Sequence, residues 1–500
     1  MKKIFLLLLI ALLPLTVCAD DSGTCGDNLT WSYVVKTGTL TISGNGEMTN
    51  FDISQRPWKG LIIKNVIIGD SVTSIGSYAF PSCSSLDSVK IGSGVKTIGG
   101  YAFKDCISLR SIIIPDNVIS IGNSTFEGCN RLLSIAIGNN VKSIGQCAFK
   151  DCILLISISF PNGMTKIENG ICYRCSFLTS VSIPSSVTTI GAGAFEQCSR
   201  LPSIYIPKSV TTIGEYVFLD CLSLASIVVE EGNTNYDSRE NCNAIIETAS
   251  NKLLTGCMKT KIPNSVTSIE TYAFSGCRDL TSIMIPKSVT SIGNRAFQNC
   301  SRLDTIVVEE GNAKYDSRED CNAIIETESN TLYVGGLNTT IPQSVTAIGN
   351  YAFRGRWLRE FTIPNHVTSI GNSTFRECIS LTTITFGSGV TSIGSESFAG
   401  CANLNTIISL NPTPPVLSRY AFDNSTYNAT LKVPVGSKSA YTEAEYWKKF
   451  TNIDEIEPAG VQIVSSDKVR PSYIYDLNGR RLDVPKKGLK IIDKKKVLVR

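Results

Sequence analysis

The chain has 500 residues, of which 42% are hydrophobic and 18% charged, and its formal net charge is +4. This composition excludes a disordered chain, because it offers enough apolar surface for a buried core. It also argues against a nucleic-acid-binding protein, which would carry a basic stripe across its folded body. Here the excess positive charge lies in residues 461–500, with eleven Lys/Arg against four Asp/Glu.

The first residues are typical of a secretory signal peptide. Lys2 and Lys3 precede an unbroken apolar run from Ile4 to Leu13, and small or modest residues lead to an expected cleavage site before Asp20. Residues 1–19 are therefore predicted to be removed. The run is too short for a membrane-spanning helix, and no other stretch of the chain is long and apolar enough for one. A loose lipobox ending at Cys18 leaves lipidation open as an alternative.

Residues 20–66 carry Trp31, a Leu40–Gly44 segment of β character and Trp58, but no repeat. A stacked array needs a terminal unit that closes its apolar end. We expect this segment to be a β-rich N-terminal cap.

A 23-residue unit then recurs along the chain, with the consensus V-T-x-I-G-x-x-A-F-x-x-C-x-x-L-x-S-I-x-I-P. A fixed period of this length indicates a solenoid of stacked coils rather than a globular enzyme. We predict an α/β, β-rich leucine-rich-repeat solenoid over residues 67–410, with about twelve turns. The Ile that precedes Gly marks each turn at Ile75, Ile98, Ile121, Ile144, Ile167, Ile190, Ile213, Ile269, Ile292, Ile348, Ile370 and Ile393.

Each repeat contains two extended segments and a third segment between them. Leu86-x-x-Val89-x-Ile91 has the spacing of a leucine-rich repeat, and its last two apolar residues share one face of a short strand. Val72 and Ile75 bracket a second strand. Apolar residues three apart, from Ala79 to Leu86, predict an inward-facing helical or 3₁₀ turn between the two strands.

Eleven of the eighteen cysteines occupy one position of the repeat. A position met once per turn stacks along the axis, so its ligands cannot converge on a metal, and buried packing thiols are expected instead. Cys172 stands where other repeats carry Phe, which indicates a core variant rather than a redox or zinc pair with Cys175. The column consists of Cys83, Cys106, Cys129, Cys152, Cys175, Cys198, Cys221, Cys277, Cys300, Cys378 and Cys401.

Two insertions, at about 230–262 and 309–341, are copies of each other. Ala244–Glu247 and Lys252–Thr255 flank a turn and predict a β-hairpin. Cys242 and Cys257 stand where a disulfide across the hairpin is an open alternative. The acidic residues Glu230, Glu231 and Asp237 fit no EF-hand spacing, so we expect a solvated insertion without calcium.

Residues 411–457 keep only a decayed repeat, ending in Tyr446–Phe450, and are predicted to form the C-terminal cap. A basic segment, 461–500, follows it.

The repeat unit, together with the cap opening Cys25–Trp31, the paired insertions and the closing Val433–Gly436, closely resembles the BspA-like leucine-rich repeat family. The resemblance implies a non-catalytic surface protein that takes part in adhesion, and it implies no catalytic residues or cofactors. Residues 461–500, with Ile474–Arg481 and Lys494–Arg500, resemble the C-terminal segment that a dedicated secretion system reads on many exported Bacteroidetes proteins. An ordinary basic β-segment remains the alternative for this tail.

The sequence offers few residues suited to catalysis. The single histidine, His366, lies in a variable turn that we expect to be exposed, so a His-based catalytic constellation would depend on a poorly placed base. We expect a protein that is not an enzyme, with no metal or cofactor site.

The outward strand positions are the better candidates for binding. One outward position of each strand is mostly Ser or Thr, and the next outward position varies from repeat to repeat. A recognition surface would show such variation, and neutral drift at tolerant positions explains it equally well. The candidate binding residues are Lys90, Ile113, Tyr205, Val228 and Met284. Apolar anchors supply most of the energy of an interface.

The sequence therefore predicts a secreted or cell-surface, adhesin-like protein. Its expected partners are extracellular protein or glycan ligands, among them host matrix or plasma proteins, and export machinery for the tail. A structural surface-layer or biofilm spacer is the alternative, and a glycan-processing enzyme is a third.

Overall fold

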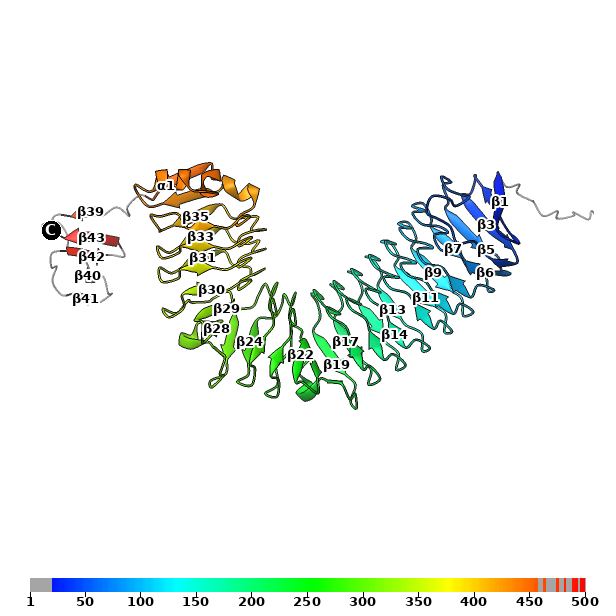
Figure 1. Ribbon diagram of the computed structural model, residues 1–500, viewed down its shortest axis with the longest axis horizontal. Coiled ribbons are helices and arrows are strands. Elements are labelled where there is room, and N and C mark those ends of the chain that lie inside the picture. Colours follow the sequence, from blue (N-terminus) through cyan, green and yellow to red (C-terminus); the bar gives the residue numbers. More distant parts are fainter. Residues whose placement is uncertain are drawn as a thin grey trace, which may run out of the picture. The chain divides into compact units, whose positions relative to one another are not determined.

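The computed structural model describes residues 20–456 and strands within 462–499, and it divides into two compact units with a boundary between Tyr315 and Asp316. Figure 1 traces the stacked coils of both units. Residues 1–19, which include the predicted signal peptide and Cys18, lie outside the described residues.

The first unit opens on an antiparallel meander that is joined directly to the stack. Its strands are β1 (Asp21–Gly26), β2 (Leu29–Val34) and β3 (Thr39–Gly44), and the short β4 (Gly46–Glu47) that follows belongs to another sheet. β3 pairs in parallel with β5, and β4 pairs in parallel with β6. Trp58 is buried at this end, where its ring stacks on Phe80 and its Nε1 donates to the carbonyl of Ala79 at 2.7 Å.

One wall of the first unit, which we call the strand face, is built from the S-I-x-I segments. Each strand pairs in parallel with its counterpart 23 residues away, as Ser134 with Ser111 and Ile135 with Ile112. The strands are β5 (Asn65–Ile68), β7 (Ser88–Lys90), β9 (Ser111–Ile114), β11 (Ser134–Ile137), β13 (Ser157–Ser159), β15 (Ser180–Ser182), β17 (Ser203–Ile206), β19 (Ser226–Val229), β24 (Ser282–Ile285) and β26 (Thr305–Val308).

The opposite wall, the second face, consists of the V-T-x-I segments, which also pair in parallel register from coil to coil. The inward Ile of each pair stacks on its equivalent, as Ile121 on Ile98. The strands are β6 (Val72–Ile75), β8 (Thr97–Ile98), β10 (Ser120–Ile121), β12 (Ser143–Ile144), β14 (Lys166–Ile167), β16 (Thr189–Ile190), β18 (Thr212–Ile213), β23 (Ser268–Ile269) and β25 (Ser291–Ile292).

The third segment of the repeat is not helical, and the expectation of a helical or 3₁₀ turn was wrong. In the repeat 72–91, the amides of Tyr78, Phe80 and Ser82 donate along the stack to carbonyls of the next coil at 3.0, 2.7 and 2.6 Å. Tyr78 and Ser82 adopt φ of 54° and 55°, which bends the chain inward twice. A helix would direct these amides into its own turn, whereas here they form a third set of inter-coil bonds, the turn ladder.

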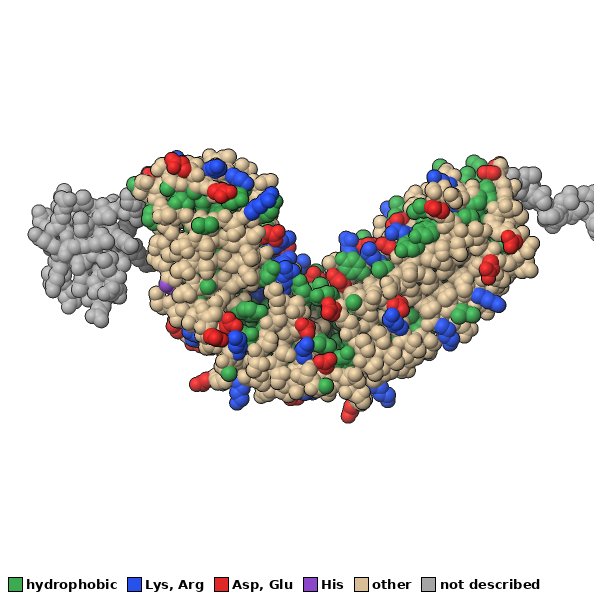
Figure 2. Space-filling model, in the orientation of Figure 1, with side chains coloured by type: hydrophobic (Ala, Val, Ile, Leu, Met, Phe, Trp, Pro, Cys, Tyr) green, Lys and Arg blue, Asp and Glu red, His purple; other side chains and the backbone are tan. Residues whose placement is uncertain are grey.

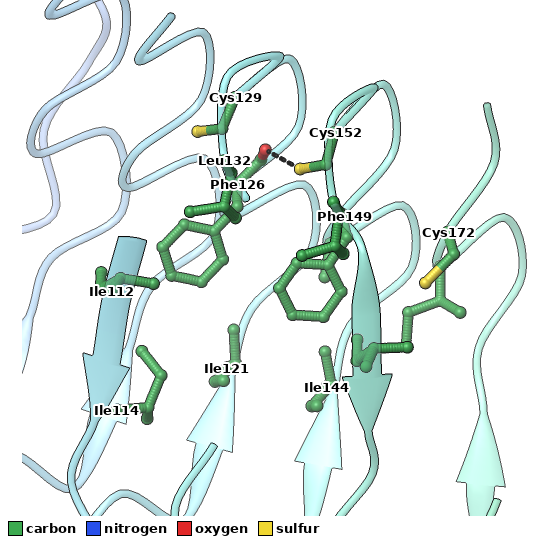
Figure 3. Packing of buried hydrophobic residues seen from close by; sticks show 14 of the residues in the cluster. Ile112, Ile114, Ile121, Phe126, Cys129, Leu132, Ile144, Phe149, Cys152 and Cys172 are labelled. Atoms are coloured by element: carbon green, nitrogen blue, oxygen red, sulfur yellow. Dashed lines mark hydrogen bonds between the residues drawn. The ribbon is translucent and has the colours of Figure 1, made fainter. Parts of the chain in front are cut away.

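The core between the three walls is built from side chains that repeat at each coil. Phe80, Phe103, Phe126 and Phe149 stack with ring centroids 5.4, 5.6 and 5.7 Å apart. The predicted cysteine column is confirmed as free thiols, and all but the half-buried Cys83 are buried. Figure 3 shows the inward Ile, Phe and Cys positions of successive coils.

The thiols do more than fill space. Cys152 donates to the carbonyl of Phe126 in the preceding coil at 3.2 Å, and Cys175 donates in the same way to Phe149 at 3.1 Å. Cys172 takes the place of a Phe and is fully buried, as predicted for a core variant. Its shorter side chain interrupts the Phe stack. Near this break, the ring centroids of Phe160 and Phe195 are 6.5 Å apart.

The first insertion forms β20 (Tyr236–Asp237), the 3₁₀ helix η1 (Arg239–Asn241), β21 (Ile245–Glu247) and β22 (Lys252–Thr255). β21 and β22 are the predicted antiparallel hairpin, and β22 also pairs in parallel with β23 of the next repeat. The thiols of Cys242 and Cys257 are both free.

The second unit repeats this design. Its insertion contributes η2 (Arg318–Asp320) and the hairpin β28 (Ala323–Glu326) with β29 (Thr331–Gly335), while β27 (Tyr315–Asp316) spans the boundary. In the second unit, the strands equivalent to the second face are β30 (Ala347–Ile348), β32 (Ser369–Ile370), β34 (Ser392–Ile393) and β36 (Val416–Leu417). The strand face consists of β31 (Glu360–Ile363), β33 (Thr383–Phe386), β35 (Thr406–Ser409), β37 (Thr430–Val433) and β38 (Asn452–Glu455).

The C-terminal end of this stack carries the remaining helices, η3 (Asn424–Asn428), α1 (Lys438–Glu443) and η4 (Trp447–Lys449). Trp447 is fully buried here and donates to the carbonyl of Pro415 at 2.7 Å. Beyond it, β39 (Gln462–Val464), β40 (Ile474–Tyr475), β41 (Arg481–Leu482), β42 (Gly488–Ile492) and β43 (Lys495–Val499) form a separate five-stranded sheet.

The solenoid fold is confirmed, but the described residues form about 18 coils rather than the twelve expected. The count rises because segments without the repeat motif still form coils. β5 stacks onto β7 at one end, β37 and β38 stack onto β35 at the other, and the hairpins pair with the repeats that follow them.

The inter-coil thiol bond gives a testable consequence. We expect Cys152→Ala to destabilise the protein by about 1–2 kcal/mol, through the loss of both the sulfur's packing and its hydrogen bond. The measurement is the shift of the urea unfolding midpoint. Cys147→Ala, at a half-buried turn position, is the control and should shift the midpoint far less. Equal shifts would mean that the thiol column contributes no specific stability.

Candidate functional site

The outward residues of the strand face in the first unit are mostly exposed, and Asn65 and Ser226 are half-buried. The hydroxyl position stays on the surface at Ser88, Ser111, Ser134, Ser157, Ser180, Ser203 and Ser282. In the next position, exposure is 70% for Ile113, 62% for Met284, 50% for Tyr205 and 44% for Val228, and Lys90 is also exposed. Strand alternation causes this, because the intervening isoleucines point inward.

Strand register places four of the five candidate residues in three groups. Tyr205 lies directly beside Val228, and Met284 beside Val307. Lys90 lies beside Ile67 near the N-terminal cap. The five predicted residues thus do not form one continuous patch.

Ile113 belongs to the stretch between these groups, next to Ala136. Two exposed residues on the same wall were missed from the sequence, Leu133 and Ile156, which precede β11 and β13 on neighbouring coils. Their amide–carbonyl contact, from Ile156 N to Leu133 O at 3.2 Å, places them side by side. Aligning the residue before the hydroxyl position across repeats would have shown them.

The surface seen in Figure 2 is mostly neither charged nor apolar, with hydrophobic and charged side chains in small groups. Many hydroxyls and carboxamides project from the coils, and several bridge them. Ser88 donates to Asn65 Oδ1 at 2.7 Å, and Thr179 Oγ1 donates to Ile156 O at 3.1 Å. Such a surface offers hydrogen bonds to a ligand, and its isolated apolar side chains offer anchors.

The acidic residues of the first insertion take part in internal contacts. Asp237 forms a two-pronged pair with Arg239, at 2.7 Å to Nε and 2.6 Å to Nη2. The same guanidinium reaches Asn251 at 2.8 Å. Glu230 accepts the amide of Lys208 at 2.9 Å. Within the part of the chain that the structure describes, no group of three or more His, Cys, Asp and Glu residues is arranged to hold a metal.

The groups with catalytic potential are poorly suited to nucleophilic chemistry. Burial raises the pKa of the Cys378 thiol to about 12 and that of the Cys25 thiol to about 11. These thiols stay protonated at neutral pH and are poor nucleophiles. His366 is half-buried in its turn rather than exposed as expected, and its Nε2 has no hydrogen-bond partner among the described residues.

A cavity of about 280 Å³ opens beside the first insertion. It is lined by the coil of Ile213–Leu224, the hairpin residues Leu254–Gly256 and the coil of Glu270–Cys277. This cavity was not predicted from the sequence, because it arises where the hairpin only partly replaces a coil.

The stacked parallel strands and the turn ladder define the class of protein as a leucine-rich-repeat solenoid. The chain matches the BspA type leucine rich repeat region (6 copies) over residues 52–175, 120–246, 250–323 and 336–456. It therefore belongs to the BspA type leucine-rich repeat family. A comparison with curated proteins gives no match.

Solved structures of bacterial repeat proteins are similar to this chain. A leucine rich cell surface protein from Faecalibacterium prausnitzii is 26% identical, with 82% of this chain and 98% of that chain covered and a TM-score of 0.48. A leucine-rich repeat protein from Bacteroides ovatus is 30% identical, with the same coverage and a TM-score of 0.44. The pneumococcal vaccine antigen PcpA is 18% identical, with 88% and 98% covered and a TM-score of 0.43.

In the described part of the chain, no helix has the length and apolar character needed to span a membrane.

Two adjacent residues of β9 test the orientation of the strand face. We expect Ile113→Lys to change the melting temperature by no more than a degree or two, because the side chain is 70% exposed. Ile112→Lys places a charge in the core, where the isoleucine is 3% exposed, and should prevent cooperative folding. Thermal unfolding followed by circular dichroism distinguishes the two, and similar melting curves would refute the assignment of the faces.

Thiol burial predicts a pattern of chemical labelling. At pH 8 the native protein should react with iodoacetamide at the half-buried Cys147 and Cys83 and much more slowly at the buried described thiols, because the reagent cannot reach them in the folded state. Peptide mass spectrometry before and after addition of urea locates the modified residues. Rapid native labelling at Cys378 would contradict the packed column.

Proposed function

We propose that this protein is a secreted or cell-surface, non-catalytic binding protein that engages extracellular protein or glycan ligands through the strand face. Membership of the BspA type family supports this proposal, as does the similar protein from Faecalibacterium prausnitzii, which is described as a cell surface protein. In the same proposal, residues 1–19 act as a signal peptide, and residues 461–500 are read by export machinery.

The observation that carries the proposal is the regular row of exposed hydroxyls next to isolated exposed apolar side chains. A surface built only for solubility would favour charged residues there, whereas Tyr205, Val228 and Met284 remain exposed. An interface needs a few apolar anchors, surrounded by polar contacts that exclude water. The spacing of the anchor groups over several coils suits an extended ligand that makes several weak contacts at once.

The binding test uses the mature protein and a panel of immobilised matrix proteins, plasma proteins and glycans, with saturation binding as the readout. We expect a saturable partner. The double variants Tyr205→Ser/Val228→Ser and Met284→Ser/Val307→Ser should each weaken its binding about tenfold, as loss of one apolar anchor does. Removal of three or four central repeats should weaken binding gradually.

The matched control is Ile119→Ser, because Ile119 is an exposed isoleucine beside β10 on the second face. It should leave binding unchanged. Uniformly weak, non-saturating binding to every immobilised ligand would refute the proposal and favour a structural spacer. Hydrolysis of a glycan that is lost on changing one carboxylate would instead indicate an enzyme.

A further inference from the structure

The cavity beside the first insertion exists because the hairpin only partly replaces a coil. In Figure 1, β22 lies between the coils that carry β19 and β24. The amide of Gly256 donates to Ala273 O at 2.8 Å, which is the bond that Phe80 makes to Ala102 in a regular repeat. Gly256 therefore holds a Phe position without a side chain. An added Cβ would lie 2.2 Å from the ring of Phe274, so no larger residue fits there.

The turn ladder is broken at the wall of the cavity. One coil earlier, the amides of Gly193 and Phe195 donate to Glu215 O and Val217 O at 2.9 and 3.0 Å. The equivalent amides of Tyr216 and Phe218 have no acceptor among the described residues. Phe218 is buried, and a buried amide without a partner costs about 1–3 kcal/mol. These two donors are available to a ligand that carries carbonyl groups.

The mouth of the cavity is aromatic and acidic. The rings of Tyr216 and Tyr272 meet edge to face, with centroids 5.4 Å apart. Glu270 pairs with Lys252 at 3.1 Å, whereas Glu215 has no cation within salt-bridge distance among the described residues. The negative charge of Glu215, followed by burial, raises the pKa of the Tyr216 hydroxyl. A cation is the complementary group, because it gains from both the carboxylate and the ring faces.

The rest of the lining is mixed, because Thr255, Thr271 and Ser275 add hydroxyls to its apolar side chains. Leu224 and Leu254 line the cavity, together with the thiols of Cys221 and Cys277. A volume of about 280 Å³ is at the lower end of ligand pockets, so it accommodates one long side chain rather than a larger molecule. Lysine and arginine combine an apolar stem with a charged head, which matches this lining and mouth.

We propose that this cavity binds a lysine or arginine side chain presented by an extended peptide segment. The stem packs against Leu224 and Leu254, the cationic head lies at Glu215 and the two tyrosines, and carbonyls of the peptide accept the amides of Tyr216 and Phe218. Such backbone pairing is the means by which extended peptides add to an open edge. The site goes beyond the proposed function, because it does not involve the strand face.

The test uses the full-length protein and two fluorescein-labelled pentapeptides, Gly-Ala-Lys-Ala-Gly and Gly-Ala-Met-Ala-Gly, with fluorescence anisotropy as the readout. We expect saturable binding of the lysine peptide and at least about tenfold weaker binding of the methionine peptide, the size of a charge and cation–π contact that is partly shielded from water. Equal binding of the two peptides, or no binding of either, would overturn the proposal.

Variants locate the site. Glu215→Gln should weaken binding of the lysine peptide about tenfold, and Thr255→Trp should abolish it by filling the cavity from the hairpin. The matched control is Glu168→Gln, because Glu168 pairs with Lys166 at 2.8 Å on a regular coil, and it should bind normally.

Melting temperatures within a few degrees of the parent protein establish that each variant is folded. An effect of Glu168→Gln equal to that of Glu215→Gln would overturn the proposal. Unchanged binding of the lysine peptide by a folded Thr255→Trp variant would also overturn the proposal. The same holds if that variant loses glycan binding but keeps peptide binding. Strand-face variants leave this assay unchanged, so failure here is distinct from failure of the proposed function.

Discussion

The structure depends on one constraint, which is that most backbone amides of a coil find their acceptors only in the neighbouring coil. The strand face, the second face and the turn ladder are three sets of such bonds around each turn. A single coil would leave these groups without partners, at a cost that its few inward side chains cannot offset. The repeat number, the caps and the columns of identical side chains all follow from this dependence on neighbours.

The same constraint explains why the side-chain columns are so regular. In-register parallel strands place identical residues above one another, so a Phe or Cys position is filled by the same shape at each level. The rings stack at about the spacing of the coils, and the thiols donate to the carbonyls that the Phe positions present. A cysteine side chain fits this position and supplies a weak S–H donor for the carbonyl. In one repeat, Arg356 occupies it instead, is buried and donates to the carbonyl of Gly335 at 2.9 Å.

The periodic features could be predicted from the sequence because they depend on local alternation. The strand at Leu86–Ile91, the inward cysteines and the hairpin at 244–255 were all evident from spacing. The turn between the strands was not, since apolar residues three apart fit both a helix and a bent segment with Tyr78 and Ser82 in the left-handed region. The bent conformation is favoured because carbonyls of the neighbouring coil accept these amides. The sequence of a single repeat does not reveal that contact.

The extra coils and the cavity escaped prediction for a related reason. β5 and β38 lack the repeat motif, yet they pair because an open edge of the stack requires a partner. The cavity depends on contacts between residues 213–224 and 270–277, which are far apart in sequence and are brought together by the hairpin. The outward residues of the strand face could be predicted only in part. Their exposure followed from alternation, but their division into separate groups depended on register.

A solenoid of this kind separates what must be constant from what is free to vary. The inward columns and the ladders fix the frame, so substitutions there affect every neighbouring coil. The outward side chains of Lys90, Ile113 and Tyr205 take no part in the backbone ladders, so these residues can differ from coil to coil without cost to the stack. An insertion adds a second kind of freedom. By holding a coil position with Gly256 and leaving the amides of Tyr216 and Phe218 without acceptors among the described residues, it creates a local defect in the turn ladder. At such a defect an incoming chain finds backbone groups to bind as well as side chains, and this distinguishes the cavity physically from the strand face of the repeats.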